Sequence, residues 1–152
     1  MKLYLMRHGD AETNDVQRPL SERGMDEVTK IAEFLASNHI EVEQIYHSGK
    51  LRAEQTARGV AANFTIAPKI DILSGLLPDD SVKAVAVYCN HWEQDVMLVG
   101  HLPFMPRLVS DLITGADDKQ CIDFKTAAIV CLERIAIFQW SISWFVYPHL
   151  LK

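Results

Sequence analysis

Short apolar runs and amphipathic segments alternate along most of this chain. The run from Lys2 to Met6 predicts a buried strand, and two further short strands are predicted at Gln44–His47 and Val96–Gly100. After Ser21, apolar residues recur at spacings of three and four, which predicts a helix with Ser21 as its N-cap. The residues expected on the buried face of that helix are Met25, Val28, Ile31, Ala32 and Leu35. Three more helices are predicted, over Lys50–Asn63, Ser81–Trp92 and Pro103–Thr114.

The C-terminal region has a different pattern. Ala127–Leu132 and Ile135–Val146 are predicted to be strands joined tightly around Glu133 and Arg134. Polar and aromatic residues alternate in the second segment, which is typical of a half-buried strand. The apolar stretch from Ile135 to Leu151 leaves a membrane anchor as the alternative, although a spanning helix would need about 20 apolar residues without this alternation.

Strands that alternate with helices predict an α/β fold, with a mostly parallel central sheet covered by helices on both faces. The last two strands could add an antiparallel edge as a hairpin. At 152 residues, the chain is expected to form a single domain over 1–152. Ligands of such folds bind at the carboxyl ends of the strands, where His8, Ser48 and His101 follow apolar segments.

Composition and charge indicate which classes of binding partner this chain is not expected to have. The net charge of −5 disfavours binding to nucleic acid or to an anionic membrane, so we expect neither. The N-terminal apolar run is too short for a signal peptide, which favours a cytoplasmic location. Cys89, Cys121 and Cys131 form no CxxC pair and are expected to be buried free thiols. The sequence contains no clustered metal-ligand motif, so no metal or cofactor is expected.

Three segments carry candidate chemistry. Arg7-His8-Gly9 combines a guanidinium fork for phosphate oxygens with a nucleophilic imidazole, and the segments Ser48–Ala57 and Val99–Pro103 supply Arg52 and His101. Arg52 is expected in the first turn of a helix, where the helix dipole favours an anion. Each segment taken alone also fits an ordinary surface loop, a solvated helix or a structural histidine.

Together and in this order, the three segments resemble the histidine phosphatase superfamily, which has the phosphoglycerate-mutase-like fold. That family begins with Arg-His-Gly, continues with Ser-x-x-x-Arg-Ala-x-Gln-Thr-Ala and later has Gly/Ser-His-x-Pro. The resemblance extends from Leu3 to about Leu112. It implies a metal-independent phosphatase in which His8 is the nucleophile. It also implies that Arg7, Arg52 and His101 bind the phosphoryl group, with Ser48 beginning the second motif.

The resemblance adds weaker candidates. Asn14 stands where many members have a phosphate-contacting asparagine, and Arg18 could add a rim contact to the phosphate or be a plain surface residue. Arginines and a cationic His101 would stabilise the charge of a phosphoryl group in transfer. The same cations should lower the pKa of His8 and leave its attacking nitrogen free.

One departure from the family pattern points to the substrate. Many members have a catalytic acid in a Leu-x-Glu segment, whereas this chain has Leu73-Ser74-Gly75. An alkoxide leaving group needs a proton donor, but a protonated imidazole does not. The missing glutamate and the short chain resemble the SixA-type protein-histidine phosphatases, which implies a histidine-phosphorylated phosphotransfer or carrier protein as substrate. Asp15 could assist proton transfer or be an exposed loop residue.

Two other functions stay open at this point. A general phosphomonoesterase or sugar-phosphate phosphatase could have the same fold, and a phosphohistidine-binding module could have lost its chemistry. A cysteine phosphatase is disfavoured because no cysteine is followed six positions later by arginine, and no DxDx[TV] motif supports an aspartyl-phosphate mechanism.

Overall fold

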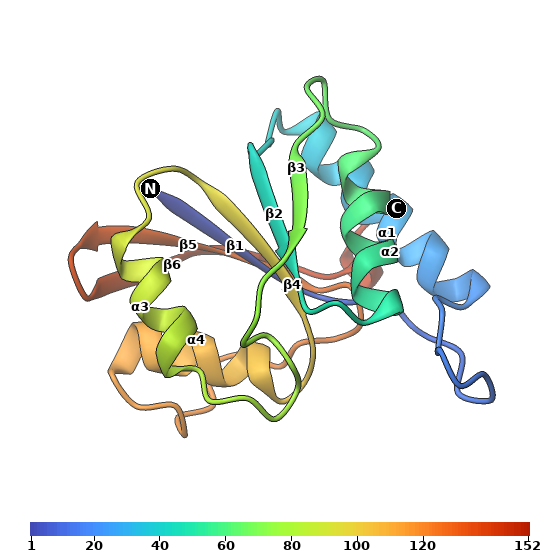
Figure 1. The fold of residues 1–152 in the computed structure, drawn as a ribbon. Helices are drawn as coiled ribbons and strands as arrows, with labels where there is room; N and C mark the ends of the chain where they lie inside the picture. Colours follow the sequence, from blue (N-terminus) through green and yellow to red (C-terminus); the bar gives the residue numbers. More distant parts are fainter.

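A six-stranded sheet forms the centre of the computed structural model, which describes residues 1–152. Its strand order is β3-β2-β4-β1-β5-β6 (Figure 1). The strands are β1 (Lys2–Arg7), β2 (Gln44–His47), β3 (Lys69–Ile72), β4 (Val96–Gly100), β5 (Ile129–Ala136) and β6 (Gln139–Val146). The first four strands in sequence are parallel, and β5 and β6 add an antiparallel edge. This confirms the predicted α/β class and its hairpin edge.

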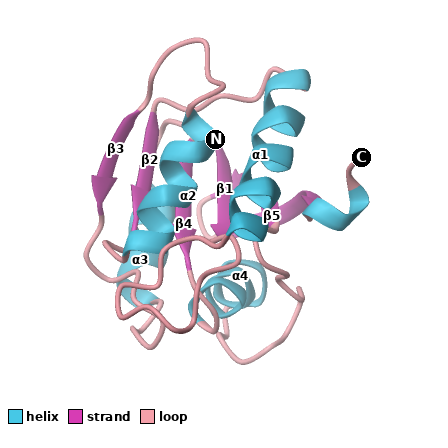
Figure 2. Ribbon diagram, turned by 90° about the vertical axis from the view of Figure 1, so that its right-hand side faces the viewer, coloured by secondary structure: helices cyan, strands magenta, loops and turns pink.

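Helices cover both faces of the sheet. They are α1 (Glu22–Ser37), α2 (Leu51–Ala61), α3 (Lys83–His91) and α4 (Phe104–Thr114), followed by the short 3₁₀ helix η1 (Pro148–Leu150). Figure 1 shows α1 and α2 on one side of the sheet and α3 and α4 on the other, and Figure 2 shows the same layers after a quarter turn. The helices α2, α3 and α4 lie within the predicted ranges.

The strand β1 shows how the sequence builds these layers. Successive side chains of a strand point to opposite faces of the sheet. Leu3 and Leu5 therefore pack into the core under α3 and α4, while Tyr4 and Met6 pack into the core under α1 and α2. Both faces of β1 are buried, which is why its sequence is a continuous apolar run.

The C-terminal hairpin turns later than the sequence predicts. The strand β5 continues through Glu133 and Arg134 to Ala136, and the chain reverses at residues 137–138. Arg134 belongs to the strand because its N–H donates to the carbonyl of Met1 and its Nη1 donates to the carbonyls of Cys89 and Asn90. These contacts are distant in sequence, so the local pattern could not indicate them.

Other corrections concern exposure. The alternation expected in β6 is interrupted by a register shift, and Ile142 is 42% exposed. Met25 is 54% exposed, whereas Gly24 and Glu27 are buried on α1 in its place. Cys121 is also exposed, unlike the other two cysteines. The edge strand β3 was not predicted, because its side chains are mostly exposed and its sequence has no apolar run.

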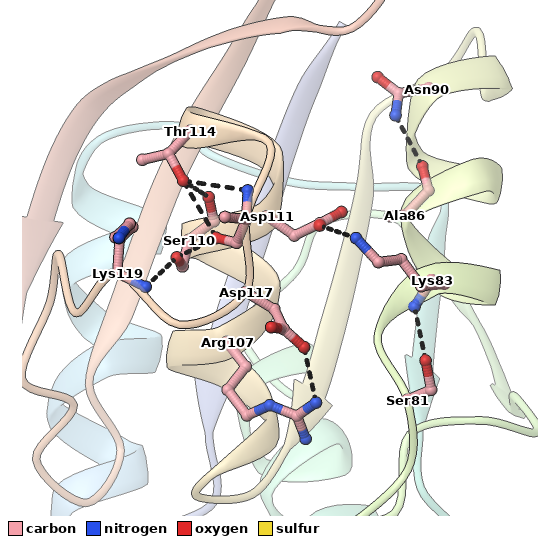
Figure 3. A network of polar contacts seen from close by, with 11 residues as sticks. Ser81, Lys83, Ala86, Asn90, Arg107, Ser110, Asp111, Thr114, Asp117 and Lys119 are labelled. Atoms are coloured by element: carbon pink, nitrogen blue, oxygen red, sulfur yellow. Dashed lines mark hydrogen bonds and ion pairs between the residues drawn. The ribbon is translucent and has the colours of Figure 1, made fainter.

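The helices α3 and α4 are held together partly by polar contacts (Figure 3). Lys83 of α3 pairs with Asp111 of α4 at 2.5 Å, and Arg107 of α4 pairs with Asp117 at 2.8 Å. Ser110 Oγ accepts a hydrogen bond from the N–H of Lys119. The last two contacts hold the segment that follows α4 against that helix. None of the helices is long and apolar enough to cross a membrane.

Candidate active site

The carboxyl ends of three neighbouring strands place the candidate residues side by side. The central strand β4 pairs with β1 and β2, with Gly100 opposite Arg7 and Val99 opposite His47. His8, Ser48 and His101 are the next residues after these strand ends. The His8 N–H donates to the carbonyl of Gly100 at 3.0 Å, which ties the two histidine-bearing turns together.

The imidazole of His8 is held in one orientation. Its Nδ1 lies 2.7 Å from the carbonyl oxygen of Gly9, and His8 is only 7% exposed. A carbonyl can only accept, so Nδ1 carries the proton and Nε2 of the neutral ring has a free electron pair. The Nε of Arg52 donates toward this Nε2 at 3.4 Å. The nucleophilic nitrogen therefore faces a guanidinium that can also hold the phosphoryl group it would attack.

The second histidine lies against the first. The ring centroids of His8 and His101 are 5.0 Å apart, with an interplanar angle of 53°. The Nε2 of His101 shares a hydrogen bond with Ser48 Oγ at 2.6 Å, while its buried Nδ1 has no partner. Ser48 therefore contacts the site through the Nε2 of His101.

Arginines reach the site from three segments. Arg7 ends β1 and donates from Nη1 to the carbonyl of Phe124 at 2.9 Å, while its buried Nε has no partner. Arg52 lies in the first turn of α2, whose N-terminus has no side-chain cap. Arg18 has a left-handed backbone, with φ of 48°, and lies near enough for its charge to lower the pKa of His8. The three guanidinium groups make this the positively charged part of the site, and each can offer several donors to the oxygens of an anion.

Burial and nearby cations keep both imidazoles neutral. Burial lowers the pKa of His8 to about 4, and Arg52 and Arg7 add to this effect against the hydrogen bond to Gly9. Burial, together with His8 and Arg52, lowers the pKa of His101 to about 3. His101 is therefore neutral in the ligand-free protein, and the expectation of a cationic His101, which concerns the phosphoryl group in transfer, stays a prediction. A bound phosphoryl dianion would raise the pKa of each ring, because an opposite charge favours the protonated form.

A titration should show these shifts directly. The folded protein releases the His8 proton near pH 4 rather than at the ordinary value of 6.5, so the ring should stay neutral throughout the intervening range. We expect the imidazole signals of His8 in a ¹H–¹³C NMR titration to move with a midpoint well below 6.5. The His8→Asn variant identifies the signal by its loss. A midpoint at or above 6.5 would show that neither burial nor the neighbouring cations lower the pKa of His8 in solution.

The structure does not bring the remaining candidates into contact with the histidines. Asn14 and Asp15 lie in an exposed loop, where Asp15 Oδ1 accepts from the N–H of Gln17. No Asp or Glu carboxylate forms a hydrogen bond or ion pair with His8 or His101. The site therefore has no evident carboxylic acid beside the nucleophile.

Two supporting residues were not singled out from the sequence. Thr56 Oγ1 accepts from the N–H of Gly9 at 3.1 Å and donates to the carbonyl of Arg52 at 2.7 Å, which couples α2 to the nucleophile loop. Glu27 is 6% exposed and accepts from the N–H of Asp10 at 2.9 Å. The sequence offers one signal for Glu27. It is a charged residue on the face of α1 that is otherwise apolar and buried, where a carboxylate needs polar partners.

A groove of about 450 Å³ borders the site. It begins at Leu102 and Pro103, directly after His101, and runs between the first turns of α4 and the segment 117–124. The same segment holds Arg7 through the carbonyl of Phe124. The groove therefore lies next to the site, since Leu102 follows His101 in the chain and Phe124 contacts Arg7.

Comparisons with known proteins agree with this geometry. The family model "Histidine phosphatase superfamily (branch 1)" matches residues 3–76. The chain is 31% identical over 159 residues to the phosphohistidine phosphatase SixA of Escherichia coli (strain K12), covering 100% of this chain and 97% of that protein.

Solved structures resemble the whole chain. The protein histidine phosphatase SixA complexed with tungstate matches with a TM-score of 0.89 and 30% identity, and each chain is covered to 100%. A phosphoserine phosphatase from Entamoeba histolytica with 3-phosphoglyceric acid matches with a TM-score of 0.75 over 99% of both chains, but at 16% identity. This second likeness concerns the fold alone.

Proposed function

The chain belongs to the histidine phosphatase superfamily, and on that premise we propose that it is a phosphohistidine phosphatase acting through a covalent phospho-His8 intermediate. The observation that carries this proposal is the state of His8. The contact of its Nδ1 with the Gly9 carbonyl assigns the ring proton to Nδ1, and the free Nε2 lies 3.4 Å from Arg52 Nε with no hydrogen-bonded carboxylate. This arrangement suits transfer of a phosphoryl group from a leaving group that needs no proton from a general acid, such as an imidazole.

In the first step, Nε2 of His8 attacks phosphorus as the P–N bond of the substrate breaks. The phosphoryl group moves to His8, and the substrate imidazole takes the electron pair of the broken bond. When the other ring nitrogen of that imidazole carries a proton, it departs as a neutral group. Arg7 and Arg52 counter the charge on the equatorial oxygens, which is the main catalytic requirement of phosphoryl transfer.

In the second step, water attacks phospho-His8 and the P–N bond to His8 breaks. Inorganic phosphate is released, and His8 recovers its free electron pair. The ring of His101 lies 5.0 Å from that of His8, and we propose that its Nε2, which shares a hydrogen bond with Ser48 Oγ, turns to donate to a phosphoryl oxygen when the substrate is bound. The approaching dianion favours protonation of His101, so its proton is gained when the ligand is present.

The comparisons support both the substrate and the phosphate site. The full-length relative in Escherichia coli bears the name phosphohistidine phosphatase. A SixA structure holds tungstate, a tetrahedral oxyanion of the same shape as phosphate. We infer that the substrate here is a histidine-phosphorylated protein, specifically a phosphotransfer or carrier domain, whose surface would lie over the groove beside His101.

The leaving group provides the test. Because no acid lies beside His8, kcat/KM for free phosphohistidine should exceed that for glycerol phosphate by roughly 10²-fold or more, the usual contribution of general acid catalysis. Phosphate release should be measured on both compounds, and on phosphotransfer and carrier domains phosphorylated on histidine with phosphoramidate.

The outcome also separates the alternatives. Equal or faster hydrolysis of glycerol phosphate or sugar phosphates would favour a general phosphomonoesterase on this fold. Tight binding of phosphohistidine domains without release of phosphate would favour a binding module. Either result would overturn the proposal.

A further inference from the structure

Glu27 is a buried carboxylate that neither step of the proposed reaction uses. Its Oε1 accepts from the N–H of Asp10 at 2.9 Å, and its Oε2 accepts from Thr126 Oγ1 at 2.7 Å. Arg23 lies 3.6 Å away on the same helix, and 6% of Glu27 is exposed. Burying a carboxylate is costly unless its hydrogen bonds are satisfied, so this placement needs a reason.

The close approach of α1 to the nucleophile loop places Glu27. A Cβ on Gly24 would come within 1.9 Å of the carbonyl oxygen of Asp10, so only glycine allows the loop to lie against the first turn of the helix. Ser21, the N-cap of α1, donates from Oγ to Asp10 Oδ2 at 2.6 Å. Glu27 follows Gly24 by three residues and therefore lies on the same face of the helix.

One peptide group connects Glu27 to the nucleophile. The N–H of Asp10 and the carbonyl of Gly9 belong to the same peptide plane, so a hydrogen bond to one fixes the direction of the other. Glu27 accepts from that N–H, and the carbonyl of Gly9 accepts from His8 Nδ1. We propose that Glu27 is a positioning residue that acts through the Gly9–Asp10 peptide to hold His8 with its proton on Nδ1 and its Nε2 free.

The arrangement follows the general logic of an oriented nucleophile, in which a third group fixes the ring that reacts. Here a peptide group stands between the carboxylate and the imidazole. A charged acceptor strengthens the hydrogen bond of Asp10, and successive hydrogen bonds polarise one another. The Gly9 carbonyl thereby becomes a stronger acceptor for Nδ1–H.

Glu27 has a second contact that could be merely structural. Thr126 precedes Ala127, whose N–H donates to the His8 carbonyl at 3.0 Å. The two contacts can be separated by mutation. Thr126→Val removes the hydrogen bond to Oε2 and leaves the bond to Asp10, whereas Glu27→Ala removes both. Glu27→Gln keeps an oxygen that can accept from Asp10 but lacks the charge.

The first measurement needs no substrate. In ¹⁵N NMR of the neutral His8 ring, we expect wild type and Thr126→Val to show protonated Nδ1 and free Nε2. Glu27→Ala should show a mixture of both tautomers, and Glu27→Gln should retain mostly the Nδ1–H form. Glu33→Gln, an exposed carboxylate on the same helix, is the matched control and should behave as wild type. An unchanged tautomer in folded Glu27→Ala would overturn the proposal.

The second measurement rests on the proposed function. Removal of residues that orient metal-binding histidines typically lowers activity 10–100-fold, and by analogy Glu27→Ala should slow phosphorylation of His8 by about 100-fold and Glu27→Gln by about 10-fold. Binding of inorganic phosphate should change by less than about threefold, because Glu27 does not touch the phosphoryl group. If Glu27→Ala does not fold, a wild-type phosphorylation rate in Glu27→Gln would reject the role of the charge. Failure of wild type itself to hydrolyse phosphohistidine would reject the proposed function and leave the tautomer result standing.

Discussion

Replacing His8 by alanine should lower kcat/KM for phosphohistidine by roughly 10⁴-fold or more, because the loss of a covalent nucleophile removes the reaction path itself. The arginines remain in place, so the variant should still bind inorganic phosphate. Wild type quenched rapidly at alkaline pH should carry one phosphate on His8, detected by intact-protein and peptide mass spectrometry. Alkaline quenching matters because phosphohistidine is labile in acid.

Two controls make this result specific. His149→Ala changes an exposed histidine on η1 and should leave both turnover and labelling as in wild type. The His8→Ala protein should show no phosphate on any other residue. Substantial residual turnover in His8→Ala, with no labelled intermediate in wild type, would mean that water attacks the substrate directly.

The strand ends of this fold were predictable because they depend on local patterns. The segments Gln44–His47 and Val96–Gly100 were assigned with the bounds that the structure shows. Each is a mostly buried segment that is followed directly by a candidate functional residue, Ser48 or His101. Once parallel pairing is assumed, the carboxyl ends of these strands must meet at one edge of the sheet. The proximity of His8 and His101 then follows.

Features that depend on contacts distant in sequence were not predictable in this way. The strand β3 is an exposed edge, and only pairing with β2 makes it a strand. Arg134 continues β5, and its N–H donates to the carbonyl of Met1, while its side chain donates to the carbonyls of Cys89 and Asn90. Glu27 lies on the buried face of α1, but the partners of its carboxylate, Asp10 and Thr126, come from segments that the helix pattern does not reveal.

The protonation state of His101 in the ligand-free protein could not be predicted from the sequence, for a different reason. A list of cationic and imidazole groups near a phosphate site suggests that His101 is protonated. The structure buries the ring and places it beside His8 and Arg52, and both effects lower its pKa. The ligand-free site therefore concentrates its positive charge on the arginines, while burial and these cations together lower the pKa of His8 and keep it neutral.

Arg52 should accordingly be the most important of the arginines. Arg52→Ala should lower kcat/KM by about 10³-fold, because a charge that stabilises both the ground state and the transition state of the phosphoryl group is lost from a partly buried site. The loss should appear in KM as well as in kcat. Arg52 also lowers the pKa of His8, so its removal should raise the His8 midpoint in the NMR titration toward 6.5.

These paired effects separate a direct electrostatic role from a structural one. Arg58→Ala removes a charge from the same helix, where exposed Arg58 pairs with Glu54 at 3.1 Å, and should leave both the rate and the His8 midpoint unchanged. Arg52→Lys keeps the charge but loses the planar fork, so it should restore the His8 pKa more fully than it restores the rate. A slow Arg52→Ala enzyme with an unchanged His8 midpoint would show that the guanidinium does not face Nε2 in solution, and the assignment of Arg52 to the phosphoryl group would then be wrong.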